Sequence, residues 1–236
     1  MGELIRGIGI NAGYARLHIL HNIDFEAHEK GITVVVGPNG SGKSTLLKTF
    51  MGLSTLYSGK IYLGDEDITR YPPYKRARMG LVYLPQVDNI FVNLTVIENI
   101  RMSLYSVRGD VEDKIEEALE LFPELKSVAK NKAYQLSGGQ RQMLALAMAM
   151  ARRPRVLMVD EPTAQLSPKL AKAILGKIVE IRDQMRIPII LVEQNARSAL
   201  EIGDKAYLLV SGRIAYEGSA QELLGHKELA KLYLGL

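Results

Sequence analysis

The nonapeptide "GPNGSGKST" has residue types and a spacing suited to binding phosphate. It satisfies G-x-x-x-x-G-K-[ST] and lies between a β-branched run, Ile32 to Val36, and a segment with a helical pattern. In such a loop, backbone N–H groups surround phosphate oxygens, and the next helix directs its positive end at them. We expect Lys43 to reach the β- and γ-phosphates of a nucleotide and Ser44 to offer its hydroxyl to Mg²⁺. The expected phosphate-binding residues, here called the phosphate loop, are Gly37, Pro38, Asn39, Gly40, Ser41, Gly42, Lys43, Ser44 and Thr45.

A pair of acidic residues follows a second apolar run, in "RVLMVDE". At a strand end, Asp160 is placed to hold the water shell of Mg²⁺, and Glu161 to orient or deprotonate an attacking water. By itself an acidic pair after an apolar run is usually a strand end or a helix cap, but the phosphate loop favours the metal-binding interpretation. Gln86 follows the strand-like "LVYLP" and is a candidate for contact with Mg²⁺ or the attacking water, although a lone glutamine there is more often a surface residue.

The peptide "YQLSGGQRQM" places two glycines at the head of a segment that is apolar all round from 143 to 151. Glycine is a poor helix former, so an ordinary helix start capped by Ser137 is one explanation and an anion-binding helix end is another. The phosphate loop already holds one side of a nucleotide. We therefore predict that two protomers enclose ATP between the phosphate loop of one and this helix end of the other. The residues predicted to bind in this way are Ser137, Gly138, Gly139 and Gln140.

The elements that must position these residues follow from the hydrophobic pattern. Short strands with turns fill the first part of the chain, residues 87–153 are mostly helical, and strands alternate with helices afterwards. This alternation predicts a parallel sheet with crossover helices. We predict a single domain, 1–236, with an α/β P-loop NTPase core (a mixed sheet with helices on both faces) formed by 1–86 and 154–236. An N-terminal antiparallel β subdomain belongs to this core, and 87–153 form an inserted α-helical subdomain.

Local patterns sharpen this prediction. "SGKIYLGDEDI" predicts a hairpin that turns at Gly64 and Asp65, and "AYLLVSGRIAYEG" predicts another. Thr95 and Glu98 fit a capping box at a helix start. "LAKAILGKIVEIRDQM", after Pro168, predicts an amphipathic helix, as does "VEDKIEEALELF".

Composition sets outer limits on function. The 236 residues are 47% hydrophobic and 24% charged, as expected of a globular protein with a sizeable core. The net charge of +4 is weak evidence for nucleic acid or a membrane surface, and we expect no nucleic-acid partner. The absence of cysteine excludes disulfides and thiolate metal sites. We see no signal peptide and no stretch of the ~20 apolar residues that a membrane-spanning helix needs, so we expect any work at a membrane to require a partner that crosses it.

In their order and spacing, the phosphate loop, Gln86, "LSGGQ", "VLMVDEP" and a later polar residue at a strand end resemble the nucleotide-binding subunit of ABC transporters. The resemblance covers essentially the whole chain and implies an ATPase that uses ATP and Mg²⁺. It implies that Tyr14, in "NAGYARLHIL", stacks on adenine. The residues alone instead favour a half-buried strand tyrosine at this position. It also implies a second ATP-binding subunit, transmembrane permease subunits docked on the helical stretch after Gln86, and a peripheral location on the cytoplasmic face of the inner or plasma membrane.

Within the family, the chain is most similar to ATPase subunits that serve branched-chain amino acid import, which act indirectly with an extracytoplasmic solute-binding protein. The marks are "GYARLHILHNIDF", "LSGGQRQMLALAMAMARRPRVLMVDEPTAQLSP", "VEQNA", "GRIAYEGSAQELL" and "LYLG". Related subunits for urea or amide import share many of them. Non-transport ATPases of the superfamily are the other alternative, but chromosome-type members need a long coiled-coil insertion and ribosome-associated members carry two motif sets in one chain. A small-molecule P-loop kinase would not need "LSGGQ".

Two positions depart from the general family pattern. The loop after Glu161 usually ends in Leu-Asp, whereas here Ser167 follows Leu166, and the family's switch histidine aligns with Gln194. A glutamine can hydrogen-bond the γ-phosphate but cannot become a cation near neutral pH. We hypothesise that the chain works beside a different ATPase subunit that carries the histidine, and the sequence leaves homodimer or heterodimer open. The candidate catalytic residues are thus Glu161, Lys43, Gln86 and Gln194, and the candidate metal ligands are Ser44, Gln86 and Asp160.

Overall fold

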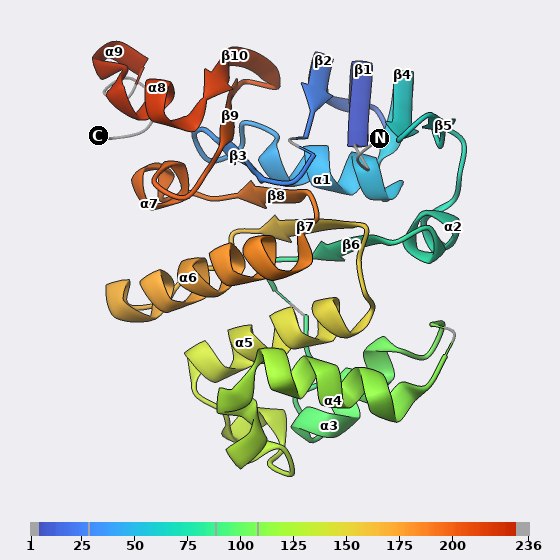
Figure 1. Ribbon diagram of the computed structural model, residues 1–236. Coiled ribbons are helices and arrows are strands. Elements are labelled where there is room, and N and C mark those ends of the chain that lie inside the picture. The colour runs from blue at the N-terminus through green and yellow to red at the C-terminus, as the bar shows by residue number, and fades with distance from the viewer. Residues whose placement is uncertain (1–4, 28, 88, 108, 230–236) are drawn as a thin grey trace.

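The computed structural model describes residues 5–27, 29–87, 89–107 and 109–229 (Figure 1). The family mark "LYLG" lies outside these residues. Within the described ranges the strands form two sheets, one of six strands and one of four. The fold confirms the predicted class: a mixed sheet with helices on both faces, accompanied by an antiparallel sheet.

The six-stranded sheet has the order β10-β9-β3-β8-β7-β6. Five strands run parallel to one another, in the order β9, β3, β8, β7 and β6. The edge strand β10 is antiparallel to β9. The register places Val35 beside Val192 and Val192 beside Asp160, so the carboxyl ends of β3, β8 and β7 lie in one row. The strands are β3 (Ile32–Val36), β6 (Leu81–Leu84), β7 (Val156–Asp160), β8 (Ile189–Val192), β9 (Lys205–Val210) and β10 (Arg213–Ser219).

The four-stranded sheet is antiparallel, with the order β2-β1-β4-β5. Leu63 of β4 pairs with Glu66 of β5 across Gly64 and Asp65, which confirms the predicted hairpin. This sheet lies beside β10 and above helix α1 in Figure 1. Its strands are β1 (Ile5–Tyr14), β2 (Leu17–Glu26), β4 (Thr55–Leu63) and β5 (Glu66–Asp67).

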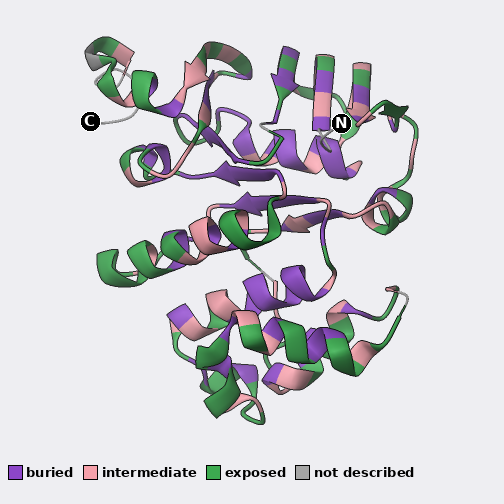
Figure 2. Cartoon of the chain, in the orientation of Figure 1, coloured by how far each residue is buried: buried purple, intermediate pink, exposed green. Residues whose placement is uncertain are grey.

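Side chains on the two faces of the six-stranded sheet enter different hydrophobic clusters, because successive residues of a strand point to opposite faces. In β3, Ile32, Val34 and Val36 join the cluster that contains α5, α6 and α7. Val35 joins the cluster that contains α1 and the antiparallel sheet. Figure 2 shows β7 and β8 buried along their length, as expected of parallel strands covered on both faces.

Helices α3 (Val96–Ser103), α4 (Val111–Leu121) and α5 (Gly138–Ala151) pack together below the sheet in Figure 1, with the short 3₁₀ segments η1 (Pro123–Val128) and η2 (Ala133–Gln135). The predicted capping box of Thr95 and Glu98 begins α3. Their hydrophobic residues share one continuous cluster with the lower face of the sheet. The limits proposed for an inserted subdomain, 87–153, therefore stay a prediction.

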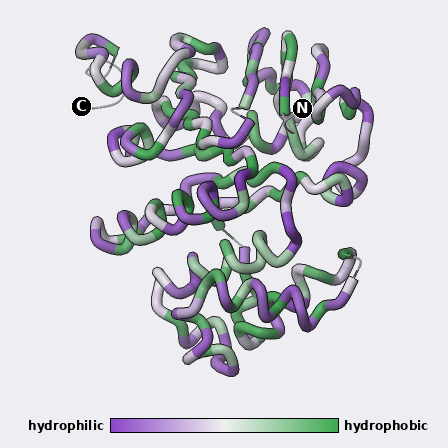
Figure 3. Tube along the Cα trace, in the orientation of Figure 1, coloured by the Kyte–Doolittle hydropathy of each residue, from purple (hydrophilic) through white to green (hydrophobic). Residues whose placement is uncertain are grey.

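The remaining helices connect or flank the strands. They are α1 (Lys43–Met51), α2 (Pro73–Arg78), α6 (Pro168–Met185), α7 (Ala196–Leu200), α8 (Ala220–Gly225) and α9 (Lys227–Leu229). Hydrophobic and hydrophilic residues alternate along α4 and α6 in Figure 3, which confirms the predicted amphipathic helices. In the described part of the chain, every helix is too short or too polar to span a bilayer.

Candidate active site

The phosphate loop leaves the end of β3 and enters α1, as the sequence predicted. Gly37 has φ +149°, and a Cβ there would lie 2.0 Å from the carbonyl oxygen of Leu209. Gly42, the residue before α1, has φ +105°. Both positions require glycine, because a side chain would collide or strain the backbone. Gly212 N–H donates to the Ser41 carbonyl at 2.9 Å, which ties the loop to the β9–β10 hairpin.

Lys43 folds back over its own loop. Its Nζ donates to the carbonyl oxygens of Gly37 at 3.0 Å and Pro38 at 3.2 Å. Nζ also lies 3.8 Å from Glu161 Oε1, and the lysine side chain is only 4% exposed. Burial lowers the pKa of Lys43, and the nearby carboxylates of Glu161 and Asp160 oppose that shift. The phosphate loop thus concentrates a desolvated cation beside acidic groups.

Asp160 ends β7 and is 3% exposed. Ser44 Oγ donates to its Oδ1 at 2.9 Å, and the Tyr83 hydroxyl donates to its Oδ2 at 2.9 Å. Burial raises the pKa of Asp160, while these two hydrogen bonds lower it in part. The Ser44 hydroxyl and the Asp160 carboxylate together provide hard oxygen ligands, the type of ligand that Mg²⁺ prefers.

Glu161 follows β7 in a left-handed conformation with φ +47°. A non-glycine residue pays about 1–3 kcal/mol for this geometry, which persists only where the surroundings enforce it. Its backbone N–H donates to the Val192 carbonyl at 2.8 Å, and its Oε2 accepts a hydrogen bond from Gln86 Nε2 at 3.0 Å. The Glu161 carboxylate is thereby held between Gln86 and Lys43.

A cavity of about 440 Å³ opens beside these groups; Asp160 and Tyr83 do not line it. The sequence-predicted residues Lys43, Ser44, Gln86, Glu161 and Gln194 all line it, together with Asn39, Gly40, Gly42, Thr45 and Ile19. Side chains from the ends of four strands and from α1 therefore converge, as ligand sites do at the carboxyl edge of a parallel sheet. The contact of Gln86 with a metal and the catalytic roles of these residues stay predictions.

Ser137 caps α5, as the simpler explanation of "LSGGQ" proposed. Its Oγ accepts from Gln140 N–H at 3.2 Å, and its own N–H donates to Gln140 Oε1 at 3.0 Å. A Cβ on Gly139 would lie 3.0 Å from Leu170. None of the described residues from Ser137 to Gln140 lines the phosphate-loop cavity. Helix α5 lies with α3 and α4, apart from α1 in Figure 1. The contact of this helix end with the nucleotide of another protomer stays a prediction.

Tyr14 is the last residue of β1, where the chain turns through Ala15 and Arg16 into β2. The residue is 37% exposed, so it is more open to solvent than the half-buried strand tyrosine considered from sequence. Among the described residues, Ile19 of β2 lines the phosphate-loop cavity and Tyr14 does not. The adenine contact of Tyr14 stays a prediction.

Two site residues escaped the sequence analysis. Tyr83 bonds Asp160 from the neighbouring strand, and Glu193 follows β8 with its carboxylate buried. The only signal in the sequence is the position of each residue relative to a strand. Glu193 follows an apolar run, as the pair Asp160 and Glu161 does, and Tyr83 is the residue of "LVYL" that carries a hydroxyl. This signal does not distinguish such residues from ordinary strand residues until the strand order is known.

The fold and the site together define an ATPase built on a P-loop core. A family model described as "ABC transporter" matches residues 20–164, and the chain therefore belongs to the ABC transporter family. It is an ATP-binding subunit that hydrolyses ATP. ATPase subunits of this family work with permease partners and dimerise.

Individual relatives extend the match over the whole chain. The "Probable branched-chain amino acid transport ATP-binding protein LivF" of Archaeoglobus fulgidus is 53% identical over 234 residues, which cover 99% of each chain. The "High-affinity branched-chain amino acid transport ATP-binding protein BraG" of Pseudomonas aeruginosa is 35% identical, covering 96% of this chain and 97% of BraG. A crystal structure of the ADP conformation of an ABC transporter cassette superposes with a TM-score of 0.85 at 25% identity, covering 98% of both chains.

Proposed function

We propose that this chain drives an importer of branched-chain amino acids. The observation that carries the solute class is the 53% identity, over nearly the full length, with a protein named for branched-chain amino acid transport. A second relative named for the same solutes, at 35% identity, supports it. Permease subunits would hold the chain at the cytoplasmic face of the membrane, and an extracytoplasmic solute-binding protein would act through them.

Hydrolysis needs a cation on the phosphates and a group that positions water. We assign the first task to Lys43, whose Nζ is buried in the phosphate loop, and the second to Glu161. Lys43 Nζ and Gln86 Nε2 hold the Glu161 carboxylate from two sides, at 3.8 and 3.0 Å. A carboxylate fixed in this way can orient a water and accept its proton without first reorganising.

The chemistry of the site fits Mg²⁺. Ser44 Oγ and the Asp160 carboxylate are adjacent oxygen donors at 2.9 Å, and Gln86 lines the same cavity. These three residues would hold the ion directly or through water. When bound, Mg²⁺ neutralises charge on the phosphates.

The other half of each reaction centre would come from a second subunit. Ser137 and the glycines after it open a 14-residue helix, whose N-terminal N–H groups and positive end suit a γ-phosphate. Because contacts to the γ-phosphate disappear on hydrolysis, ATP would close the pair of subunits and hydrolysis would release it.

The test is to reconstitute the chain with its permease subunits in vesicles and measure ATP hydrolysis. We expect a solute-binding protein loaded with leucine, isoleucine or valine to stimulate hydrolysis and drive uptake of the amino acid. Stimulation by urea or an amide alone would assign a different solute. Hydrolysis that responds to no solute and no permease would contradict a transport role.

Gln194 raises a separate question, because it occupies the place of the family's switch histidine. We infer that the partner subunit carries the histidine and that Gln194 supports the γ-phosphate only as a neutral hydrogen-bonding group. Single-turnover hydrolysis by Gln194→His should be faster than by wild type in a homodimer. An unchanged rate would show that glutamine in place of histidine at position 194 does not affect hydrolysis.

A further inference from the structure

Glu193 is a buried carboxylate that the mechanism above does not use. It directly follows β8 and is 2% exposed. We propose that Glu193 is a positioning residue, which fixes the spacing between Glu161 and Gln194 in the phosphate-loop cavity. The proposal rests on the functions proposed above for those two residues.

The first attachment runs from Glu193 to the loop that carries Glu161. Glu193 Oε1 accepts from the backbone N–H of Thr163 at 3.0 Å and from Thr163 Oγ1 at 2.8 Å. One residue earlier on β8, the Val192 carbonyl accepts from Glu161 N–H at 2.8 Å. The end of β8 thus holds the loop at two points, on both sides of the left-handed turn at Glu161.

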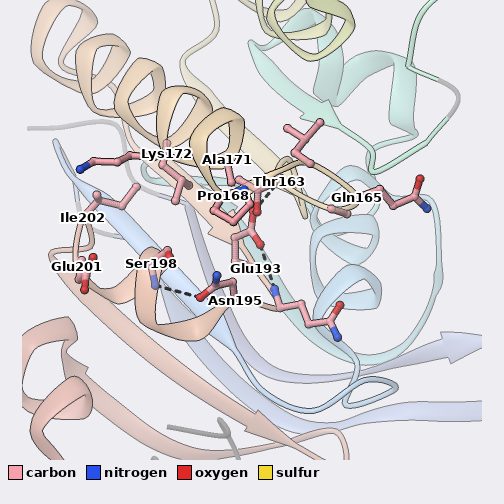
Figure 4. A pocket seen from close by; sticks show the side chains of 14 residues that line it. Thr163, Gln165, Pro168, Ala171, Lys172, Glu193, Asn195, Ser198, Glu201 and Ile202 are labelled. Carbon is pink, nitrogen blue, oxygen red and sulfur yellow. Dashed lines mark hydrogen bonds between the residues drawn. The ribbon is translucent and has the colours of Figure 1, made fainter. Parts of the chain in front are cut away.

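The second attachment runs from Glu193 to its own neighbour. Its Oε2 accepts from the backbone N–H of Gln194 at 3.2 Å, so the two carboxylate oxygens face two different segments. Figure 4 shows Glu193 in the middle of this group, with its carboxylate toward Thr163 and with Asn195 and Ser198 on the far side. Glu161 and Gln194 both line the phosphate-loop cavity, and Glu193 links the backbones that present them.

The three contacts all require an acceptor. Two N–H groups and one hydroxyl donate, and an ionised carboxylate is the side chain that accepts on both of its oxygens. A glutamine of the same shape would bring its own NH₂ group against one of these donors. Burial raises the pKa of Glu193, and the hydrogen bonds from Thr163 and Gln194 oppose that shift. Burying an acidic side chain costs free energy. The presence of Glu193 at this position is explained if the geometry that it imposes on Glu161 and Gln194 matters to the reaction.

The test compares Glu193→Gln with wild type, using the full chain and MgATP. We expect ATP affinity to change less than about threefold, while kcat falls about tenfold or more because Glu161 and Gln194 lose their relative placement. The matched controls are Thr163→Val, which removes only the hydroxyl bond, and Thr163→Ser, which retains it. Thr163→Val should lower kcat severalfold at unchanged KM, and Thr163→Ser should restore it.

The alternatives give different results. A kcat within twofold of wild type for Glu193→Gln would overturn the proposal. A parallel loss of kcat, ATP affinity and melting temperature would also overturn it, because a purely structural residue behaves in that way. If Glu193→Gln does not fold, the Thr163 pair decides: equal kcat for the valine and serine variants contradicts the proposal. Lys43→Ala calibrates the assay; if it binds and hydrolyses ATP like wild type, the proposed site itself is wrong.

Discussion

Asp160 is under opposing physical demands. Its carboxylate is almost fully buried, and Ser44 and Tyr83 supply one hydrogen bond each. Burial raises the pKa of Asp160 above its ordinary value of 3.8 despite both hydrogen bonds. The desolvation penalty of the charged carboxylate is therefore larger than the stabilisation that the two neutral donors provide. The folded protein would therefore be more stable with a neutral group at this position.

Asp160→Asn should consequently raise the melting temperature at pH 7 by a few degrees while lowering Mg²⁺-dependent hydrolysis by about 100-fold or more. The folded pKa is raised, so the cost of the charge is fully present above that pKa and is relieved on acidification. The difference in melting temperature between variant and wild type should therefore shrink as the pH falls toward 3.8. Calorimetry at several pH values checks this. A variant less stable than wild type at pH 7 would show that the two hydrogen bonds outweigh desolvation.

Tyr14 carries the prediction of adenine stacking, and its partial exposure makes that prediction testable without unfolding the sheet. Stacking of a base on an aromatic ring is worth ~1–3 kcal/mol. Tyr14→Ala should thus weaken ATP binding about tenfold, and Tyr14→Phe should bind normally. Tyr105→Ala, at a more exposed tyrosine in the helical region, is the control and should leave affinity unchanged. Equal affinity for the two Tyr14 variants would contradict the stacking role.

At the scale of elements, local patterns predicted most of the site because they depend on neighbours in sequence. The phosphate loop, the end of β7 and the cap of α5 each follow from a short stretch. The strand order was not predictable, because pairing of β3 with both β8 and β9 is a long-range outcome. Tyr83 and Glu193 acquire their partners only through that order, so the sequence did not identify them.

Helix α5 offers a prediction that separates stability from function. Replacing a helical glycine by alanine usually stabilises a helix by about 0.5–1 kcal/mol. At Gly139 the new methyl would contact the flexible end of Leu170 at 3.0 Å, which cancels part of that gain. Gly139→Ala should leave the melting temperature within about 2 °C, yet lower hydrolysis tenfold or more by blocking the approach of phosphate to the helix end.

The matched control is Gly176→Ala in α6, where the added Cβ meets nothing within 4 Å. This variant should be more stable by the full helix-propensity gain, with hydrolysis unchanged. Hydrolysis by Gly139→Ala at the wild-type rate would mean that no anion approaches this end of α5.

For the whole molecule, the decisive feature is the arrangement of the two parts proposed to bind nucleotide, the phosphate loop and the start of α5. The phosphate loop enters α1 between the two sheets, whereas α5 begins among the helices below the six-stranded sheet (Figure 1). The continuous hydrophobic cluster that joins α5 to the sheet opposes a large internal rearrangement, because packed cores resist continuous deformation. We therefore do not expect one copy to bring both parts to the same phosphate, and we expect the second part to come from another subunit.

If Glu161 positions the attacking water as proposed, Glu161→Gln should slow hydrolysis. We then expect this variant to accumulate a dimer in MgATP but not in MgADP. Ser137→Asp in the same background should abolish that dimer. Aspartate caps a helix as well as serine does and suits its positive end, so α5 and the melting temperature should be preserved. The added charge would instead repel the γ-phosphate of the second protomer. Ser219→Asp, at the capping box of α8, makes the same change elsewhere and should leave the dimer intact. Light scattering distinguishes the outcomes, and an ATP-dependent dimer that survives Ser137→Asp would place this helix end away from the nucleotide.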